Sequence, residues 1–319
     1  MNNPSLKKRT LLYLGPKQFI SDIESNFKEY NVFSTIDEIE VDRILDSVSI
    51  IIDACLEIKF DKNRLLLARN LLIYATASTG FTHIDHIHLA EQNITLISLK
   101  GKKEFLKGIT PAAEHSWLLL MMCARKVKSA INDINNDIWE RTRYPGKLIK
   151  GKTLGLIGVG RIGSWMAKYA EAFGMKCIGY DPCPIDVPKN VRLTPIEELV
   201  KEADFISLHV NYEKELDRFI SKELINNFKR GSIFINTSRG ELVDEDALAK
   251  AFLKGDIASI GIDVLTNEQE YKKSNLFKLS KKHDDIIITP HIAGYSPDVF
   301  PMVLQYICEQ VKIEMDKLK

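Results

Sequence analysis

The feature that most constrains the fold is a glycine turn, GLIGVGRIG at Gly155–Gly163, set between a short apolar run and a helical pattern. Such a turn joins a strand to a helix in a βαβ unit, and each glycine in it has a physical purpose. Gly158 permits the tight turn, Gly160 lets backbone approach a pyrophosphate at the helix amino terminus, and Gly163 allows close helix–strand packing. The segment therefore predicts a doubly wound parallel sheet that binds a dinucleotide.

Asp181 follows the next apolar run, close to the offset of about 20 residues at which a carboxylate holds the ribose hydroxyls of adenosine. Its charge would repel a 2′-phosphate, and neither Pro182 nor Cys183 supplies a compensating charge. NAD is therefore favoured over NADP. A turn-forming Asp-Pro pair is the plainer interpretation of this residue, but the strand, glycine turn and helix together favour cofactor binding.

Apolar runs alternate with amphipathic stretches in two series along the chain. This alternation predicts α/β architecture, with parallel sheets covered by helices on both faces. Expected strands are Leu11–Leu14, Ser49–Asp53, Leu71–Ala75 and Ile94–Ser98, then Thr153–Ile157, Lys176–Tyr180, Asp204–Leu208, Ser232–Asn236, Ala258–Ile262 and Ile286–Thr289. Expected helices are Gln18–Lys28, Ile84–Gln92, Ile162–Phe173, Ile196–Val200 and Glu245–Lys254.

Two domains are expected, because 319 residues exceed one typical core. A long helical pattern at Pro111–Lys128 joins the two series, and Pro111 suits a first helical turn. The carboxy-terminal stretch Pro297–Lys319 is amphipathic and can return to the first domain, which would make the second an insertion. The expected domains are 1–109 with 295–319, and 110–294.

The composition excludes several classes of protein. A net charge of +1 gives no reason to expect a nucleic acid or an acidic membrane as partner. No apolar run approaches the ~18 residues of a membrane helix, and the first apolar stretch is too short for a secretory signal, so we expect a cytoplasmic protein. The cysteines are odd in number and lack CxxC pairing, which predicts reduced thiols and no metal site. They are Cys55, Cys123, Cys177, Cys183 and Cys308.

Three further segments follow predicted strands and deliver an arginine, a carboxylate and a histidine in that order. Arg239 lies where ligands bind in open α/β sheets, and its guanidinium can fork onto a carboxylate or a carbonyl oxygen. His291 can pass a proton near neutral pH. Glu268, if it contacts the imidazole, would favour its charged form and fix its orientation. The segments are NTSRGELVD at Asn236–Asp244, GIDVLTNE at Gly261–Glu268 and TPHIAG at Thr289–Gly294.

Each of these side chains also has a plainer interpretation. Arg239 can pair with Asp244 or Glu241 at the surface, and an isolated strand-end histidine is usually bonded to backbone. Glu268 lies in a polar stretch that water can solvate, and the sequence does not reveal whether it reaches His291. As an ordered set, however, the segments suit hydride transfer at the carbon next to a carboxylate.

The motifs and their order resemble the D-2-hydroxyacid dehydrogenases, the family that includes D-3-phosphoglycerate, D-lactate and glycerate dehydrogenases and formate dehydrogenase. The resemblance spans roughly Ala75 to the carboxy terminus. It implies a Rossmann NAD-binding domain inserted into a discontinuous, flavodoxin-like substrate-binding domain, and a homodimer built on the NAD-binding domain. It assigns the substrate carboxylate and carbonyl to Arg239, and general acid/base catalysis to His291. It makes Glu268 the residue that keeps the histidine protonated to higher pH.

Other positions take their roles from the same resemblance. STGFTHID, which begins at Ser78, is similar to the family loop whose backbone amides, here those of Thr79 and Gly80, hold the substrate carboxylate. Asp263 would lie near the nicotinamide carboxamide. His209 would line the adenosine side, although a packed strand-end histidine is its plainer interpretation. The expected cofactor-binding residues are Gly158, Gly160, Arg161, Ile162, Gly163, Asp181, His209, Thr237, Asp263 and Gly294.

The sequence departs from the family pattern at three places, and the third puts the identity of the substrate in doubt. Asn211 stands where proline usually follows LHV, and Ala293 stands where glycine is common. The expected loop Leu99–Thr110, near the substrate side, is longer than usual and basic. This basic loop is either a solvated part of the surface or a binding element for a second anionic group of the substrate. Its lysines are Lys100, Lys102, Lys103 and Lys107.

The expected function is hydride transfer between NADH and C2 of a 2-keto or D-2-hydroxy acid. An NAD(H)-sensing binding protein of the same fold is the alternative, because corepressors that resemble this family can keep all three catalytic side chains. Formate oxidation ranks lower, since the family's formate enzymes carry glutamine where Glu268 stands. Which 2-hydroxy acid is used, and in which direction, stays open.

Overall fold

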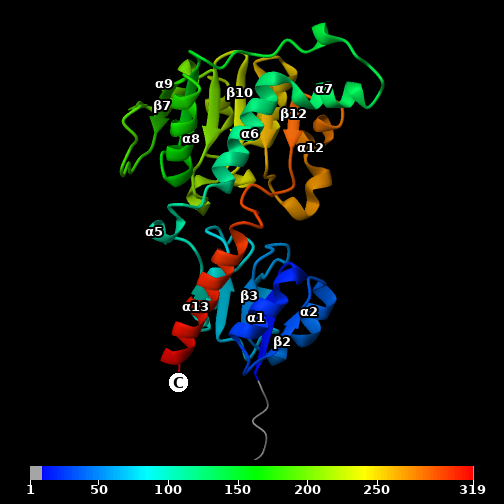
Figure 1. Cartoon of the computed structure of the whole chain (residues 1–319), viewed down its shortest axis with the longest axis vertical. Coiled ribbons are helices and arrows are strands. Elements are labelled where there is room, and N and C mark those ends of the chain that lie inside the picture. Colours follow the sequence, from blue (N-terminus) through cyan, green and yellow to red (C-terminus); the bar gives the residue numbers. More distant parts are fainter. Residues whose placement is uncertain (1–8, 319) are drawn as a thin grey trace, which may run out of the picture. The chain divides into compact units, whose positions relative to one another are not determined.

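The computed structural model describes residues 9–318, and its chain divides into two compact units (Figure 1). Of the described residues, 9–106 and 296–318 belong to one unit, and 107–295 belong to the other. Within these ranges each unit holds one sheet, of five strands in the first and seven in the second. Helices pack against both sheets, which confirms the predicted α/β class.

The five-stranded sheet of the first unit is parallel throughout, in the order β2-β1-β3-β4-β5. This is the flavodoxin-like order. The carboxy-terminal helix α13 packs against α1, β4 and β5, so the last segment of the chain belongs to this unit. The strands are β1 (Thr10–Leu14), β2 (Asn31–Ser34), β3 (Val48–Asp53), β4 (Ile73–Thr76) and β5 (Thr95–Ile97). The helices are η1 (Lys17–Phe19), α1 (Ile20–Asn26), α2 (Glu38–Ile44), η2 (Leu45–Ser47), α3 (Lys62–Leu65), α4 (His86–Glu91), α5 (Lys103–Leu106) and α13 (Phe300–Lys317).

The seven-stranded sheet of the second unit is also parallel, in the order β12-β11-β10-β9-β6-β7-β8. The chain order reverses between β6 and β9, which creates the crevice where Rossmann folds bind ligands. The strands are β6 (Thr153–Ile157), β7 (Lys176–Tyr180), β8 (Val191–Leu193), β9 (Phe205–Leu208), β10 (Ser232–Asn236), β11 (Ile257–Ile262) and β12 (Ile286–Ile288).

Two apolar clusters cover the two faces of this sheet. One includes buried side chains of α6 and α8, which lie side by side in Figure 1, and the other includes those of α9, α10, α11 and α12. The helices are α6 (Pro111–Arg125), α7 (Val127–Ile134), η3 (Arg141–Arg143), α8 (Arg161–Ala172), α9 (Ile196–Glu202), η4 (Lys214–Leu216), α10 (Lys222–Ile225), η5 (Gly240–Leu242), α11 (Glu245–Leu253), η6 (Glu268–Lys273) and α12 (Asn275–Ser280).

The register of this sheet brings three loops together. Asn236 pairs with Ile262, and Ile262 pairs with Ile288. These residues end β10, β11 and β12, so the chain leaves all three strands at the same level. The segments that carry Arg239 and His291 therefore start on either side of the segment that leads to Glu268.

The elements differ from the predicted ones mainly at the sheet edges. β2 and β8 were not predicted, because each is a short edge strand in which at most one residue is buried. The helix expected over Pro111–Lys128 is interrupted, since Lys126 adopts a left-handed conformation with φ 53° and separates α6 from α7. The segment expected to be a loop at Leu99–Thr110 contains the short helix α5.

Candidate active site

The glycine turn between β6 and α8 has the shape that a pyrophosphate needs. Gly158 has φ 92°, and a Cβ there would lie 2.4 Å from the carbonyl oxygen of His209. Gly160 is the N-cap of α8 without a side-chain hydrogen bond, and the space where its Cβ would stand is open. The first N–H groups of α8 are thus left without a side-chain cap, and a helix amino terminus in this state attracts anions. These residues fit a dinucleotide.

Asp181 is held beside this turn. Its carboxylate accepts hydrogen bonds from the backbone amide of Val159, at 2.9 Å, and from that of Cys183, at 3.0 Å. Val159 lies between the first two glycines of the motif. The turn itself therefore fixes the carboxylate at the end of β7, and remaining lone pairs of its two oxygens can accept hydrogen bonds from ribose hydroxyls.

Two other expected cofactor residues have defined partners in this unit. His209 follows β9 and places Nε2 2.8 Å from Ser207 Oγ. Burial lowers its pKa to about 3, so the ring is neutral at physiological pH, and its buried Nδ1 has no hydrogen-bond partner among the described residues. The guanidinium of Arg161 donates to the carbonyl of Ile109, and burial lowers its pKa. Ile162 is partly buried, Gly163 is buried and Gly294 is exposed.

The loop after β10 holds Arg239 through short-range hydrogen bonds. Asn236 Nδ2 donates to the carbonyl of Arg239 at 2.9 Å, and Asn236 Oδ1 accepts from the amide of Ser238 at 2.9 Å. A Cβ at Gly240 would lie 2.1 Å from the carbonyl carbon of Leu265. Glycine thus lets this loop pass against the backbone that leads to Glu268. Burial lowers the pKa of the Arg239 guanidinium, and the charge of Glu268 opposes that shift.

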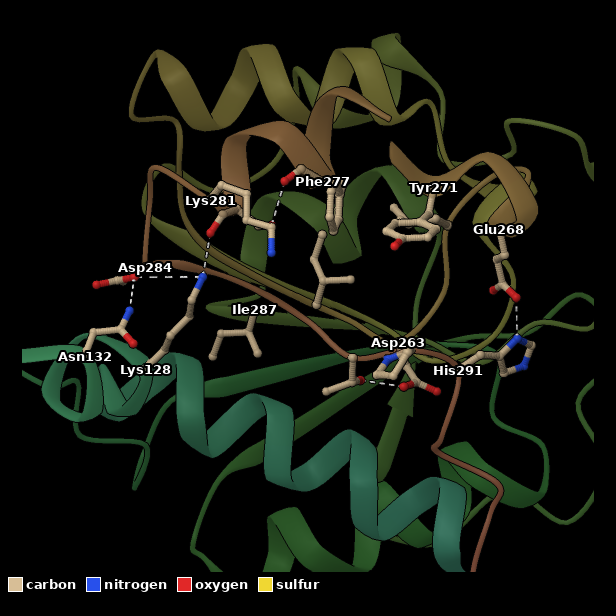
Figure 2. A pocket seen from close by; sticks show the side chains of 15 residues that line it. Lys128, Asn132, Asp263, Glu268, Tyr271, Phe277, Lys281, Asp284, Ile287 and His291 are labelled. Carbon is tan, nitrogen blue, oxygen red and sulfur yellow. Dashed lines mark hydrogen bonds and ion pairs between the residues drawn. The ribbon is translucent and has the colours of Figure 1, made fainter. Parts of the chain in front are cut away.

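Glu268 and His291 form the central contact of the site. His291 Nδ1 lies 2.7 Å from Glu268 Oε2, as the dashed line in Figure 2 marks. The contact assigns Nδ1 to the carboxylate and leaves Nε2 as the nitrogen that can exchange a proton with a substrate. Asn267, with φ 54°, and His291, with φ 53°, both have left-handed backbone. Such a conformation costs a non-glycine residue about 1–3 kcal/mol, so the surrounding contacts must maintain it.

Asp263 supplies those contacts for His291. Its carboxylate is buried and accepts hydrogen bonds from the amides of Ile292, at 3.0 Å, and Ala293, at 2.8 Å, and from the hydroxyl of Thr289. Its carbonyl accepts from the amide of His291 at 2.8 Å. Burial alone would raise the pKa of this carboxyl, but hydrogen bonds, led by that from His115, lower it. A charged Asp263 therefore holds the turn that carries His291.

Two polar residues of α6 also reach this site, and the sequence did not single them out. His115 Nε2 lies 2.9 Å from Thr289 Oγ1 and 3.5 Å from Asp263 Oδ1. Ser116 Oγ lies 2.7 Å from Oγ1 of Thr237, an expected cofactor residue. Both residues sit within a long helical pattern, and no motif marks which of its side chains face the sheet.

The expected substrate loop lies in the first unit, after β4. Ser78 Oγ donates to the carbonyl of Gly80, and the carbonyl of Ser78 accepts from the amide of Leu99 at 2.9 Å. Further along, His83 Nε2 lies 2.9 Å from Oδ2 of the buried Asp53. The loop that contains Thr79 is thus held at several points, and Ser78, Thr79 and Gly80 are all partly exposed.

The four lysines of the basic segment are exposed. Lys100 contacts the expected substrate loop, since its ammonium lies 5.6 Å from the centroid of the Phe81 ring. Cation–π contacts at exposed sites are worth about 0.5–1 kcal/mol.

A pocket of about 610 Å³ adjoins the Glu268–His291 pair (Figure 2). Its wall includes the apolar side chains of Leu265, Phe277 and Ile287, and it extends to Lys128 on α7. Lys128 donates to the carbonyls of Ser280, at 2.7 Å, and Ile286, at 2.9 Å. Neither Arg239 nor the glycine turn lines this pocket. The pocket is therefore separate from the dinucleotide-binding motif.

Residues 9–318 offer neither a metal-binding cluster nor a membrane-spanning helix. No group of three or more His, Cys, Asp or Glu side chains there could hold a metal ion. Over the same residues, none of the helices combines the length and the hydropathy that a membrane span needs.

The reversed strand order, the glycine turn and Asp181 define a dinucleotide-binding α/β protein whose second unit is a Rossmann fold. Residues 117–293 match the family model described as D-isomer specific 2-hydroxyacid dehydrogenase, NAD binding domain. Hydroxypyruvate reductase of Thermotoga maritima is 31% identical over 92% of this chain and 90% of its own length. The chain belongs to the D-isomer specific 2-hydroxyacid dehydrogenase family, and its cofactor is NAD, as the sequence motifs predicted.

Other relatives have related names. Glyoxylate reductase of Korarchaeum cryptofilum is 32% identical over 76% of this chain and 73% of its own length. D-3-phosphoglycerate dehydrogenase of Methanocaldococcus jannaschii is 34% identical over 77% of this chain, which spans only 46% of that relative. The structure of D-lactate dehydrogenase from Aquifex aeolicus with NAD and lactic acid has a TM-score of 0.85 and 28% identity over 96% of both chains.

Proposed function

We propose that this protein reduces a small 2-keto acid to the D-2-hydroxy acid with NADH. The observation that carries the proposal is the 2.7 Å contact between Glu268 and His291, next to a loop that presents Arg239. A histidine, its orienting carboxylate and a partly buried cation are the groups that reduction of a keto acid requires. Membership of the family supports NAD-dependent oxidoreductase chemistry at this site.

In the proposed reaction, bound NADH supplies the hydride that forms the new C–H bond at C2. His291 then gives its Nε2 proton to the former carbonyl oxygen, so that the C=O group becomes CH–OH. Arg239 binds the substrate carboxylate and carbonyl and stabilises the charge that develops on the oxygen. Glu268 fixes the ring of His291 through Nδ1.

Other residues bind the substrate and the cofactor in this proposal. Residues 1–109 with 295–319 form the substrate-binding domain, and residues 110–294 form the NAD-binding domain. The amides of Thr79 and Gly80 bind the substrate carboxylate, which the hydrogen bonds that fix their loop support. Asp181 binds the adenosine ribose, and its attachment to the glycine turn supports that role. Asp263 lies at the nicotinamide carboxamide and His209 at the adenosine.

The names of the relatives support a small keto acid as substrate, since they include reductases of hydroxypyruvate and glyoxylate. The relative named D-3-phosphoglycerate dehydrogenase supports a phosphorylated substrate, although this chain spans only about half the length of that protein. Lys100, beside the substrate loop, is the described lysine best placed to meet a second anionic group.

We further propose a cytoplasmic homodimer. All five cysteines are free thiols, which supports a reducing compartment. The segment after α6 supports dimerisation, because Ile131 and Ile134 of α7 are 52% and 50% exposed and the nearby Trp139 is 90% exposed. Apolar surface of this kind often marks a protein–protein contact.

A panel of 2-keto acids tests the function directly. Pyruvate, hydroxypyruvate, glyoxylate, phosphohydroxypyruvate and 2-oxoglutarate are each mixed with NADH, and NADH oxidation is followed in the steady state. We expect sustained turnover of at least one keto acid, and its loss by about 10²–10⁴-fold in His291→Ala with NADH affinity kept within a few-fold. NADH binding without turnover of any keto acid would contradict the proposal and favour an NAD(H)-sensing protein.

A further inference from the structure

Two consecutive residues of α6, His115 and Ser116, each contact a different loop of the site. His115 Nε2 lies 2.9 Å from Thr289 Oγ1, and Ser116 Oγ lies 2.7 Å from Thr237 Oγ1. Thr289 stands two residues before His291, and Thr237 stands two residues before Arg239. One turn of one helix therefore contacts both loops that carry the proposed catalytic side chains.

The sheet explains why this double contact forms. Thr237 is the first residue after β10, and Thr289 is the first residue after β12. The register places the ends of these strands at the same level, with β11 between them. Because α6 packs across β10, β11 and β12, adjacent side chains of the helix can reach both threonines.

The direction of the hydrogen bonds shows what His115 does. The single hydroxyl proton of Thr289 points to the Asp263 carboxylate, so Thr289 Oγ1 must accept the hydrogen bond from His115 Nε2–H. The chain of donation runs from His115 through Thr289 to Asp263, and Oδ1 of Asp263 also lies 3.5 Å from His115 Nε2 itself. Asp263 in turn accepts hydrogen bonds from the amides of Ile292 and Ala293, which directly follow the left-handed His291.

Ser116 acts on the other loop by a shorter route. Its side chain is fully buried, and its hydroxyl contacts both Thr237 and the carbonyl of Ala112, at 2.6 Å, within α6. A serine hydroxyl has one proton to donate. When Ser116 donates it to Ala112, Thr237 donates its own proton to Ser116, and the start of the Arg239 loop becomes fixed to the helix.

We infer that His115 and Ser116, here called the α6 brace, are positioning residues that separately set the loops of His291 and Arg239. Neither is a catalytic residue, since Ser116 acts through Thr237, and His115 acts through Thr289 and Asp263. The kinetic part of this inference rests on the proposed function, whereas the loop contacts themselves do not. The brace also explains a buried serine and a partly buried histidine on a helix face that otherwise packs apolar residues against the sheet.

Hydrogen exchange measured by mass spectrometry tests the brace without any need for turnover. In His115→Leu, amides in 289–294 should exchange about tenfold faster, while those in 236–240 stay within about twofold, because local opening follows local contacts. Ser116→Ala should give the reverse pattern. His115→Gln should restore slow exchange, because a glutamine Nε2 can donate in place of the ring Nε2–H.

Ser259→Ala is the matched control. Ser259 is buried in β11 and donates to the carbonyl of Asp285 at 2.6 Å, so its loss removes a comparable hydrogen bond away from both loops. It should leave exchange in both loops unchanged. If His115→Leu does not fold, Thr289→Val removes the same link and should reproduce its pattern. Equal acceleration of both loops in either variant, or no acceleration, would overturn the inference.

Kinetics then separate the two halves of the brace. His115→Leu should lower kcat for keto-acid reduction by about tenfold or more with KM changed a few-fold at most, because the proton donor is displaced. Ser116→Ala should raise KM as well as lower kcat, since Arg239 in its proposed role both binds the substrate and stabilises the charge that develops on its oxygen. Loop-specific exchange without turnover by the unaltered protein would refute the proposed function and leave the brace standing. Turnover together with unchanged exchange in the variants would refute the brace alone.

Discussion

His291 combines a strained backbone with an oriented side chain. Its left-handed conformation is held by Asp263, and its Nδ1 is held by Glu268. The resemblance assigned Asp263 to the nicotinamide carboxamide. The structure adds that this carboxylate already binds the turn of the histidine. The proposed proton donor thus depends on two carboxylates with different tasks, of which one fixes backbone and the other fixes the ring.

Glu268→Ala should lower kcat for keto-acid reduction by about tenfold or more and change KM a few-fold at most. In the proposed reaction His291 gives its Nε2 proton to the substrate, and Glu268 Oε2 fixes the ring through its 2.7 Å contact with Nδ1. Without that contact, the ring can rotate away from the position that proton transfer needs. Glu270→Ala is the matched control, because Glu270 pairs with Lys273 and Asn267 instead. The same kcat in all three proteins would make Glu268 a solvated residue.

Asp181→Ser should narrow the preference for NADH over NADPH. The carboxylate is fixed beside the glycine turn, where its charge repels a 2′-phosphate. We expect the unaltered protein to favour NADH by orders of magnitude in kcat/KM. The substitution should lower NADH efficiency and raise NADPH efficiency. Equal use of both cofactors by the unaltered protein would disprove this role of Asp181.

At the scale of elements, runs of buried residues made most of the sheets predictable. β3 and β6 are buried along their whole length, and both were expected from their apolar runs. β2 has no fully buried residue and alternates exposed with partly buried positions, so its sequence carries no strong signal. The break at Lys126 was also beyond prediction, because a lysine in left-handed conformation has no local sequence mark.

The basic segment offers a prediction about substrate choice. Lys100→Ala should lower kcat/KM for phosphohydroxypyruvate or 2-oxoglutarate by up to about fivefold and leave pyruvate unchanged, since exposed ion pairs give no more than ~1 kcal/mol. The reason is that the ammonium of Lys100 lies over the ring of Phe81, which is part of the expected substrate loop. Lys102→Ala, also exposed on this segment, is the control. Small, equal, salt-sensitive losses in both variants would make the segment a solvated surface.

At the scale of the whole molecule, His209 should make stability depend on pH. Its pKa is about 3 in the folded protein and about 6.5 in an unfolded chain, so only the unfolded state takes up a proton as pH falls below 6.5. Stability is therefore full above pH 6.5 and declines toward pH 3. Between pH 7.5 and 5.5, without cofactor, the free energy of unfolding of His209→Gln should fall by about 1.4 kcal/mol less than that of the unaltered protein. Equal decreases in the two proteins, measured by urea unfolding, would contradict a His209 ring that stays neutral in the folded state.

The sequence was sufficient to name the motifs of the site but not the contacts that join them. Arg239, Glu268 and His291 could be named because each follows a strand in a motif of known order. His115 and Ser116 could not, because their roles depend on which face of α6 meets the sheet and on the register of β10 with β12. Such contacts between distant segments arise from packing, which a single sequence does not encode locally.

The fate of the transferred hydride shows whether this protein reduces a keto acid to the D-2-hydroxy acid. The keto acid that turns over fastest is reduced with NADH carrying deuterium at the transferable C4 position, and the product is examined by chiral chromatography and mass spectrometry. We predict the D-2-hydroxy acid with one deuterium at C2, in an amount equal to the NADH consumed. An L product, a product without deuterium, or NADH binding with no product would contradict the account.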